Sequence, residues 1–294
     1  MILLHFPLSA ARGWKRKRAF YGIDRLGAVK GIAILVLSAM SLIGCNLQYS
    51  MLYYPDATVP SEAQLAAGRI RFWPSGLSGY RGFIAADETE KRQGTILVFH
   101  GNAGTAADRV YYIQALGSLG YRVILAEYPG YGKREGELGE ASLVNDAKAS
   151  VRLALEKYGP PLLLVGESLG CAVAAGAAAD ASLKIDGLLL ITPWETLLAV
   201  AKSHFRFLPV GLFLRDRYDS RQNLRNFRGS IAVVGAGRDE IVPLRHAESL
   251  YASLSGPKRM WTLPGVGHND WPMAVDAQKW QEFMGFLLSP VAAR

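Results

Sequence analysis

Short uncharged runs alternate with longer amphipathic stretches along most of the chain, a pattern typical of strands that alternate with helices. The runs expected to form buried strands are residues 95–99, 123–126, 162–165, 188–191, 231–234 and 260–263. The stretches expected to form helices are residues 106–119, 140–158, 169–179, 244–254 and 271–288. Two earlier segments, 69–73 and 80–86, are expected to begin the sheet in antiparallel order. This order of elements predicts a mostly parallel central sheet flanked by helices.

Two regions depart from this alternation. Residues 48–68 contain Pro55 and Pro60 and are expected to be a connector that precedes the folded domain at 69–294. Residues 193–228 are rich in aromatic and arginine side chains and separate two expected strands by far more than one helix. We interpret the second region as a small helical insertion.

The segment Gly166-Glu167-Ser168-Leu169-Gly170 is a G-x-S-x-G sequence. An apolar run precedes it and an alanine-rich stretch follows it, which indicates a strand, a sharp turn and a helix. Such a turn holds the serine hydroxyl clear of the sheet, at the N-terminus of the helix. Ser168 is therefore the expected nucleophile, against the alternative of a serine in a structural turn.

A nucleophilic serine needs a base and an acid that orients the base. Asp239 and His268 each lie in a glycine-containing loop directly after an expected strand. Because the ends of parallel strands meet at one edge of a sheet, these loops are expected to converge with Ser168. Glu240 is the alternative acid, whereas His100 is expected to have a structural role.

The loop after the expected strand at 95–99 is rich in glycine, His100-Gly101-Asn102-Ala103-Gly104. Glycines allow backbone N–H groups to turn toward a ligand. We expect the N–H groups of Asn102 and Leu169 to stabilise the negative charge that develops on a carbonyl oxygen, forming an oxyanion hole.

Taken together, four motifs resemble those of the α/β-hydrolase superfamily, and the likeness covers roughly residues 69 to 288. They are His100-Gly101-Asn102, Gly166 to Gly170, Gly237-Arg238-Asp239 and Gly267-His268. The segment Glu127-Tyr128-Pro129-Gly130-Tyr131-Gly132 is similar to a branch of small-lid, membrane-tethered serine hydrolases. That branch contains esterases, depalmitoylases and proteins like serine aminopeptidases. It usually has Arg at the position of Pro129 and often Ser at that of Arg134.

The resemblance implies the α/β-hydrolase fold, with residues 193–228 as a small helical lid over the active site. It implies cleavage of a carboxylic ester or thioester through an acyl-enzyme intermediate, without metal or organic cofactor. The expected substrate is a small or lipid-like acyl ester, with Tyr128, Phe205 and Phe213 as candidate substrate contacts. The alternatives are a serine peptidase or amidase on the same fold, and a catalytically idle binding protein on a hydrolase scaffold.

The distribution of charge argues against a nucleic-acid partner. The formal net charge is +8, but residues 12–30 hold seven bases and one acid. The remainder of the chain has 26 bases against 24 acids and is nearly neutral. No Cys/His cluster has the spacing of a zinc site.

The basic N-terminal region is followed by an uncharged apolar stretch at 31–47 that contains Leu42-Ile43-Gly44-Cys45. This order is typical of an export signal or a membrane anchor. Leu42-Ile43-Gly44-Cys45 resembles a lipobox, the site where bacterial lipoproteins are cut before a lipid-bearing cysteine. We expect lipid on Cys45 and a protein that faces the periplasm or the cell exterior. The alternative is an uncleaved single-pass anchor, and both hypotheses attach residues 1–47 to a membrane.

Overall fold

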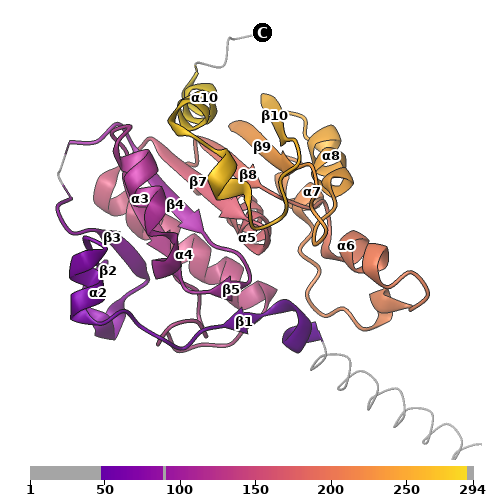
Figure 1. Ribbon diagram of the computed structural model, residues 1–294, viewed down its shortest axis with the longest axis horizontal. Coiled ribbons are helices and arrows are strands. Elements are labelled where there is room, and N and C mark those ends of the chain that lie inside the picture. Colours follow the sequence, from indigo (N-terminus) through magenta and orange to yellow (C-terminus); the bar gives the residue numbers. More distant parts are fainter. Residues whose placement is uncertain (1–47, 89–90, 290–294) are drawn as a thin grey trace, which may run out of the picture. The chain divides into compact units, whose positions relative to one another are not determined.

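The computed structural model describes residues 48–88 and 91–289. Its described residues form an eight-stranded sheet with the order β10-β9-β8-β7-β4-β6-β3-β2 (Figure 1). The strands are β2 (Ile70–Trp73), β3 (Gly82–Ala85), β4 (Thr95–Phe99), β6 (Arg122–Ala126), β7 (Leu162–Glu167), β8 (Gly187–Ile191), β9 (Ser230–Ala236) and β10 (Lys258–Leu263). Residues 1–47, including Cys45, lie outside the described residues, so neither hypothesis for that segment meets a structural test here.

Strand direction agrees with the sequence expectation. The pairs from β10 through β6 are parallel. The pairs β3–β6 and β2–β3 are antiparallel, at one end of the sheet. The expected fold, a mostly parallel sheet flanked by helices that begins with antiparallel strands, is confirmed.

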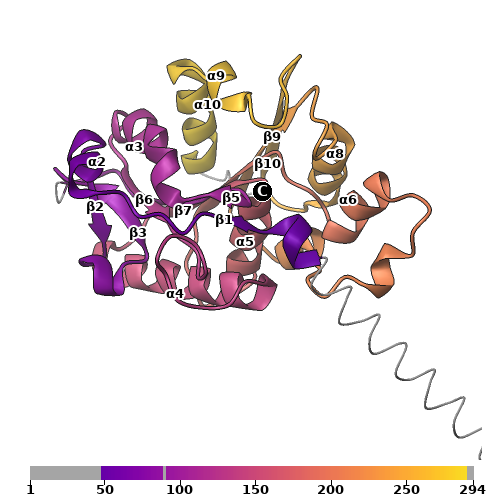
Figure 2. The ribbon, with the colours of Figure 1, turned by 60° about the horizontal axis from the view of Figure 1, so that its bottom comes forward.

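Helices cover both faces of the sheet (Figure 2). They are α2 (Glu62–Ala67), α3 (Val110–Gly117), α4 (Glu140–Tyr158), α5 (Leu169–Ala178), α6 (Leu197–His204), α7 (Ser220–Leu224), α8 (Leu244–Ser253), α9 (Trp271–Ala274) and α10 (Ala277–Leu288). Short 3-10 turns occur at η1 (Leu77–Gly79), η2 (Ala106–Arg109) and η3 (Val210–Leu212). None of the helices within the described residues combines the length and the apolar character needed to span a bilayer.

Two hydrophobic cores lie on opposite faces of the sheet because successive strand residues point to opposite sides. On β4, Ile96 and Val98 pack into one core together with residues of α3 and α10. Leu97 and Phe99 pack into the other core, with residues of α4, α5 and α8. Both faces of the central strands are therefore buried, which explains their continuous apolar runs.

The helix expected at 271–288 is in fact two helices, α9 and α10. Between them Val275 is buried, and the Asp276 side chain accepts a hydrogen bond of 2.8 Å from the backbone N–H of Lys279. An aspartate at this position caps a new helix, because it satisfies an N–H group that has no acceptor in the first turn. The expectation missed this internal cap.

Residues 48–68 are also more than the expected connector. Residues 48–52 are helical, and β1 (Tyr54–Pro55) pairs in parallel with β5 (Ala103–Gly104). The segment ends in α2, whose first turn is capped by Ser61. Residues from Gln48 onward belong to one compact unit. The prolines obscured this packing in the sequence, because they prevent a regular helix or strand pattern from emerging.

Residues 193–228, the lid segment, contain α6, η3 and α7 between β8 and β9. Thr196 begins α6, and its hydroxyl accepts a hydrogen bond from the backbone N–H of Ala199. The helical character expected for this insertion is present. Its role as a lid stays a prediction.

The turn between β7 and α5 depends on two glycines that lie against other backbone atoms. A Cβ on Gly170 would overlap the carbonyl oxygen of Phe99, at the end of β4. A Cβ on Gly166 would lie 2.5 Å from the backbone nitrogen of Cys171. Neither obstacle is a flexible side chain, so neither can move aside without distorting the sheet or the helix.

We therefore expect Gly170→Ala to destabilise the fold by about 3 kcal/mol or more, at the upper end of the cost of overpacking. Gly285→Ala is the matched control, because a Cβ there meets nothing within 4 Å on α10. That change should be neutral or stabilising by up to about 1 kcal/mol, since alanine favours a helix over glycine. Urea denaturation of both variants measures the difference, and equal stabilities would contradict the close approach described here.

Candidate active site

Ser168 lies at the turn from β7 to α5 in a backbone conformation that is uncommon for residues other than glycine. Its φ is 50° and its ψ is −112°. Such a conformation costs roughly 1–3 kcal/mol and persists only where the surroundings enforce it. Here the Ser168 N–H donates to the carbonyl of Ile191 at 2.9 Å, and the Ser168 carbonyl accepts from the N–H of Cys171 at 3.0 Å. The turn is held from both sides.

A continuous chain of hydrogen bonds leads from Ser168 to Asp239. His268 Nε2 lies 2.9 Å from Ser168 Oγ, and His268 Nδ1 lies 2.7 Å from Asp239 Oδ2. The other carboxylate oxygen accepts from the backbone N–H groups of Ile241 at 3.0 Å and Val242 at 2.6 Å. Because the carboxylate only accepts, this network assigns the proton to Nδ1 and leaves Nε2 to accept from the serine hydroxyl.

The structure thus brings together the three residues that the sequence singled out from three separate loops. Asp239 is buried, whereas the alternative acid Glu240 is exposed. Asp239, and not Glu240, contacts His268.

The loop after β4 lies beside Ser168, and contacts from two other segments fix it. A Cβ on Gly101 would lie 3.9 Å from the Cβ of Ser168. The carbonyl of Asn102 accepts from the N–H of Tyr54 at 2.9 Å and from the hydroxyl of Tyr131 at 2.8 Å. The Asn102 side chain donates to the carbonyl of Leu52 at 2.9 Å. These bonds use the carbonyl and the side chain of Asn102, so its backbone N–H takes part in none of them.

Leu169, the second expected oxyanion donor, is the first residue of α5. Its N–H therefore has no acceptor within the helix, because the first N–H groups of any helix lack one. The N-terminus of a helix also favours negative charge. The positions of Asn102 and Leu169 are consistent with the oxyanion hole expected from sequence.

Glu127, the residue after β6, fixes the same loop through hydrogen bonds. Its carboxylate lies 3.0 Å from His100 Nε2 and accepts from the N–H of Ala106 at 3.0 Å. His100 Nδ1 in turn donates to the carbonyl of Gly101 at 2.8 Å. His100 and Glu127 are both buried. The expected structural role of His100 is confirmed.

Glu167, next to Ser168, is buried and joins β7 to η2 and α3. It accepts from Arg109 Nε at 3.0 Å and from the hydroxyl of Tyr111. Burial alone would lower the pKa of Arg109, but the Glu167 carboxylate outweighs it and the pKa is raised. Burial, and then Glu167, raise the pKa of Tyr111. Arg109 therefore remains charged beside Glu167, and Tyr111 remains protonated.

Tyr128 is a core residue. Its side chain is buried, and its hydroxyl donates to the carbonyl of His100 at 2.7 Å. Burial raises the pKa of this tyrosine well above its usual value. The expected contact of Tyr128 with substrate is therefore not supported, because its side chain packs inside the protein.

Phe205 is exposed and Phe213 half-buried, both in the lid segment, and their contact with substrate stays a prediction. Arg134, where the resembling branch often has Ser, makes two hydrogen bonds to the carboxylate of Asp146 on α4, at 2.7 and 2.8 Å. The Arg134 side chain is therefore bound to α4.

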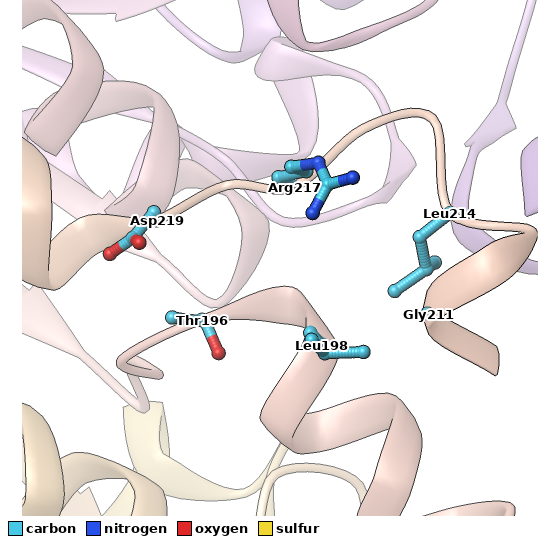
Figure 3. Close-up of a pocket in the computed structure, with 6 residues that line it drawn as sticks. All are labelled: Thr196, Leu198, Gly211, Leu214, Arg217 and Asp219. Atoms are coloured by element: carbon cyan, nitrogen blue, oxygen red, sulfur yellow. The ribbon is translucent and has the colours of Figure 1, made fainter. Parts of the chain in front are cut away.

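A small cavity of about 110 Å³ lies in the lid segment (Figure 3). Its lining residues are Thr196, Leu198, Gly211, Leu214, Arg217 and Asp219. Neither Ser168 nor His268 lines it. Within the described residues no group of three or more His, Cys, Asp or Glu side chains is arranged to hold a metal ion.

Sequence reasoning missed the supports of the site: the contacts of Leu52 and Tyr54 with Asn102, and the pair of Arg109 with Glu167. The buried position of Glu167, inside an apolar strand and turn, was the one available signal that a cation must lie nearby. No comparable signal marked Leu52 or Tyr54.

Comparison with known proteins agrees with the fold. A family model described as the α/β hydrolase fold matches residues 94–230. The uncharacterised protein Rv2307c of Mycobacterium tuberculosis is 34% identical over 248 residues, which cover 82% of this chain and 88% of that protein. The lysophosphatidylserine lipase ABHD12 of Danio rerio is 33% identical over 175 residues, 53% of this chain and 46% of the lipase.

Solved structures show the same fold. The esterase Pf2001 of Pyrococcus furiosus superposes with a TM-score of 0.61 at 15% identity, covering 81% of this chain and 98% of the esterase. A monoacylglycerol lipase of Paleococcus ferrophilus gives a TM-score of 0.53 at 18% identity, covering 67% of this chain and 96% of the lipase.

The support of the turn by Glu167 can be tested on stability. Glu167→Gln removes the charge opposite Arg109 in a buried pair, which should cost about 3 kcal/mol. Asp87→Asn is the matched control, because the Arg69–Asp87 pair is exposed, with side chains 76% and 63% accessible. That change should cost less than about 1 kcal/mol. Thermal unfolding measures the stability of the two variants. An equal loss of stability in both would contradict a special role for Glu167 in supporting the turn.

Proposed function

Because this chain belongs to the α/β-hydrolase family, we propose that it is a serine hydrolase of carboxylic esters or thioesters, acting through an acyl-enzyme intermediate at a membrane. The observation that carries the proposal is the hydrogen-bonded chain Ser168–His268–Asp239 at the turn between β7 and α5. Its tautomer is the one that a general base requires, with Nε2 free to accept the serine proton.

The proposed reaction begins when His268 Nε2 takes the proton of Ser168 Oγ as this oxygen attacks the carbonyl carbon of the substrate. Asp239 stabilises the imidazolium that forms. The backbone N–H groups of Asn102 and Leu169 donate to the negatively charged oxygen of the tetrahedral intermediate, and each such donor is worth roughly 10²–10³ in rate. The imidazolium then protonates the departing alcohol or thiol. Water, activated by the same histidine, releases the acid and restores Ser168.

Lipid-like acyl esters are the proposed substrate class. The support comes from the similarity to a lysophosphatidylserine lipase, and from an apolar lid segment that offers surface to an acyl chain. Phe205 and Phe213 remain the proposed contacts there. The proposal includes no metal, organic cofactor or nucleic acid. Amide cleavage by the same residues is the second candidate, because the acyl-enzyme mechanism serves both bonds.

Loss of Ser168 tests the proposal most directly. Ser168→Ala should abolish labelling by a fluorophosphonate probe and hydrolysis of p-nitrophenyl esters, while the protein stays folded. Ser203→Ala is the matched control, because Ser203 Oγ also lies near a buried histidine, 3.3 Å from His246 Nε2. That variant should keep both activities. Labelling of Ser168→Ala at the wild-type level would refute the nucleophile, and faster cleavage of peptide anilides than of esters by the wild type would favour the amidase.

Attachment to a membrane through residues 1–47 is the second part of the proposal, supported by the basic lead and the uncharged stretch at 31–47. Two or three acyl chains on Cys45 would hold the protein firmly, at about 0.8 kcal/mol for each buried CH₂. Intact mass spectrometry should find a chain that begins at Cys45 and carries lipid, and Cys45→Ala should leave the precursor uncut. An unmodified wild-type chain that retains residues 1–44 would exclude the lipoprotein and favour the single-pass anchor.

A further inference from the structure

The segment after α6 exposes an unusual number of large apolar side chains. Among the described residues, four of the nine exposed large apolar side chains fall within residues 205–212, here called the apolar tip. Their exposed fractions are 37% for Phe205, 99% for Phe207, 59% for Leu208 and 78% for Leu212. Single exposed apolar residues are ordinary, whereas a cluster of this kind marks a surface that binds something.

The apolar tip has a defined shape. Its backbone makes short-range hydrogen bonds from Leu208 to Phe205 at 3.2 Å, from Val210 to Leu208 at 2.8 Å and from Leu212 to Pro209 at 3.0 Å. These bonds hold the turn while four of its large apolar side chains are exposed. Figures 1 and 2 both show the segment projecting away from the central sheet.

Exposed basic residues flank the apolar tip along the chain. Between Leu197 and Arg217 the exposed charged residues are all basic: Lys202, Arg206, Arg215 and Arg217. Asp216 is the acid in this stretch, and it is buried, with its carboxylate accepting from Tyr53 Oη at 2.7 Å. An apolar centre with a basic rim matches the interface of an anionic lipid bilayer, where apolar side chains enter the headgroup region and cations meet phosphates.

The path of the chain also points to a membrane. Gln48 binds the base of the lid segment: its side-chain oxygen accepts from the N–H of Arg215 at 2.6 Å, and its side-chain nitrogen donates to the carbonyl of Asp216 at 3.2 Å. The uncharged stretch at 31–47 is joined directly to Gln48 in the sequence. If that stretch enters a bilayer, its attachment point lies at the base of the segment that carries the apolar tip.

The apolar tip is also connected to the candidate active site. His204, at the end of α6, donates through Nε2 to the carbonyl of Ile241 at 2.8 Å. The N–H of Ile241 in turn donates to Asp239 Oδ1 at 3.0 Å. Ile241 is itself 51% exposed and adds apolar surface beside the loop that carries Asp239.

We propose that the apolar tip and its basic rim form a docking surface for an anionic lipid bilayer. Phe207 and Leu212 enter the headgroup region, and Arg206 and Arg215 bind lipid phosphates. This inference rests on the proposed membrane attachment and extends it, because docking sets the orientation of the body and brings the loop of Asp239 toward the lipid from which an acyl substrate would come.

A fluorophore that reports its surroundings tests the proposal without requiring catalysis. We would attach NBD to the introduced thiol of Phe207→Cys in the full-length chain with Ser168→Ala and Cys45→Ser, since the remaining Cys171 is buried. Met273→Cys is the matched control, because Met273 is also exposed, at 85%, but belongs to α9. The carriers are vesicles of phosphatidylcholine with and without phosphatidylglycerol.

The expected result is a blue shift of NBD emission at the Phe207→Cys position on vesicles that contain phosphatidylglycerol, a smaller shift on phosphatidylcholine alone, and none at the Met273→Cys position. Arg206→Gln or Arg215→Gln should each lower the ratio of inserted to free apolar tip by roughly fivefold, as expected for one basic residue at an anionic surface.

Several outcomes would overturn the proposal. Equal shifts at the two positions, or none at Phe207→Cys, would exclude insertion of the apolar tip. A blue shift without vesicles would identify a different occupant: residues 31–47 of the same chain if the shift is independent of protein concentration, or a second copy if it rises with concentration. Because Ser168 is replaced throughout, failure here leaves the proposed hydrolysis standing, and failure of the hydrolysis leaves this measurement unaffected.

Discussion

The close approach of backbone to backbone at the turn from β7 to α5 is the constraint on which the site depends. Gly166 and Gly170 have no side chain there because a Cβ would meet backbone atoms of α5 or of β4. Between them Ser168 takes a positive φ of 50°. The strain is offset by burial, since all ten residues of α5 are buried and β7 lies between β4 and β8. The backbone of Ser168 is therefore fixed at the end of β7, beside the loops that carry His268 and Asp239.

Three buried carboxylates line the same edge of the sheet, where parallel strands end. Glu127 directly follows β6, Glu167 is the last residue of β7, and Asp239 follows β9. Buried carboxylates must be hydrogen-bonded, and each of these meets a different partner. Glu127 fixes the loop after β4, Glu167 binds Arg109 on η2, and Asp239 orients His268. Glu127 and Glu167 thus fix the loops around Ser168, and Asp239 holds the imidazole of His268 beside it.

The lid segment combines a polar base with an apolar end. At its base Asp216 accepts from Tyr53, whose hydroxyl also lies 2.9 Å from that of Tyr218. Burial raises the pKa of both tyrosines, so both remain protonated. Tyr53 donates its proton to Asp216 and accepts from the hydroxyl of Tyr218. The N–H of Glu140, at the start of α4, completes this cluster at 3.1 Å from Asp216 Oδ1. The lid segment is thus fixed at Asp216 by residues 48–53 and by the start of α4, and the apolar tip projects from this fixed point.

Much of this architecture could be predicted from the sequence, because strand and helix periodicities are local properties. The strands and most helices agree with the expectation, and helix 140–158 does so to the residue. The convergence of Ser168, Asp239 and His268 could be anticipated as well, since each follows a strand and parallel strands end at one edge.

The tertiary structure alone decided the rest. Residues 48–68 pack against the loop of Asn102, and Tyr128 turns into the core. Both features depend on contacts between residues far apart in the sequence. Hydrophobic periodicity carries no information about such contacts, because it shows which side chains are buried and not which partners they contact.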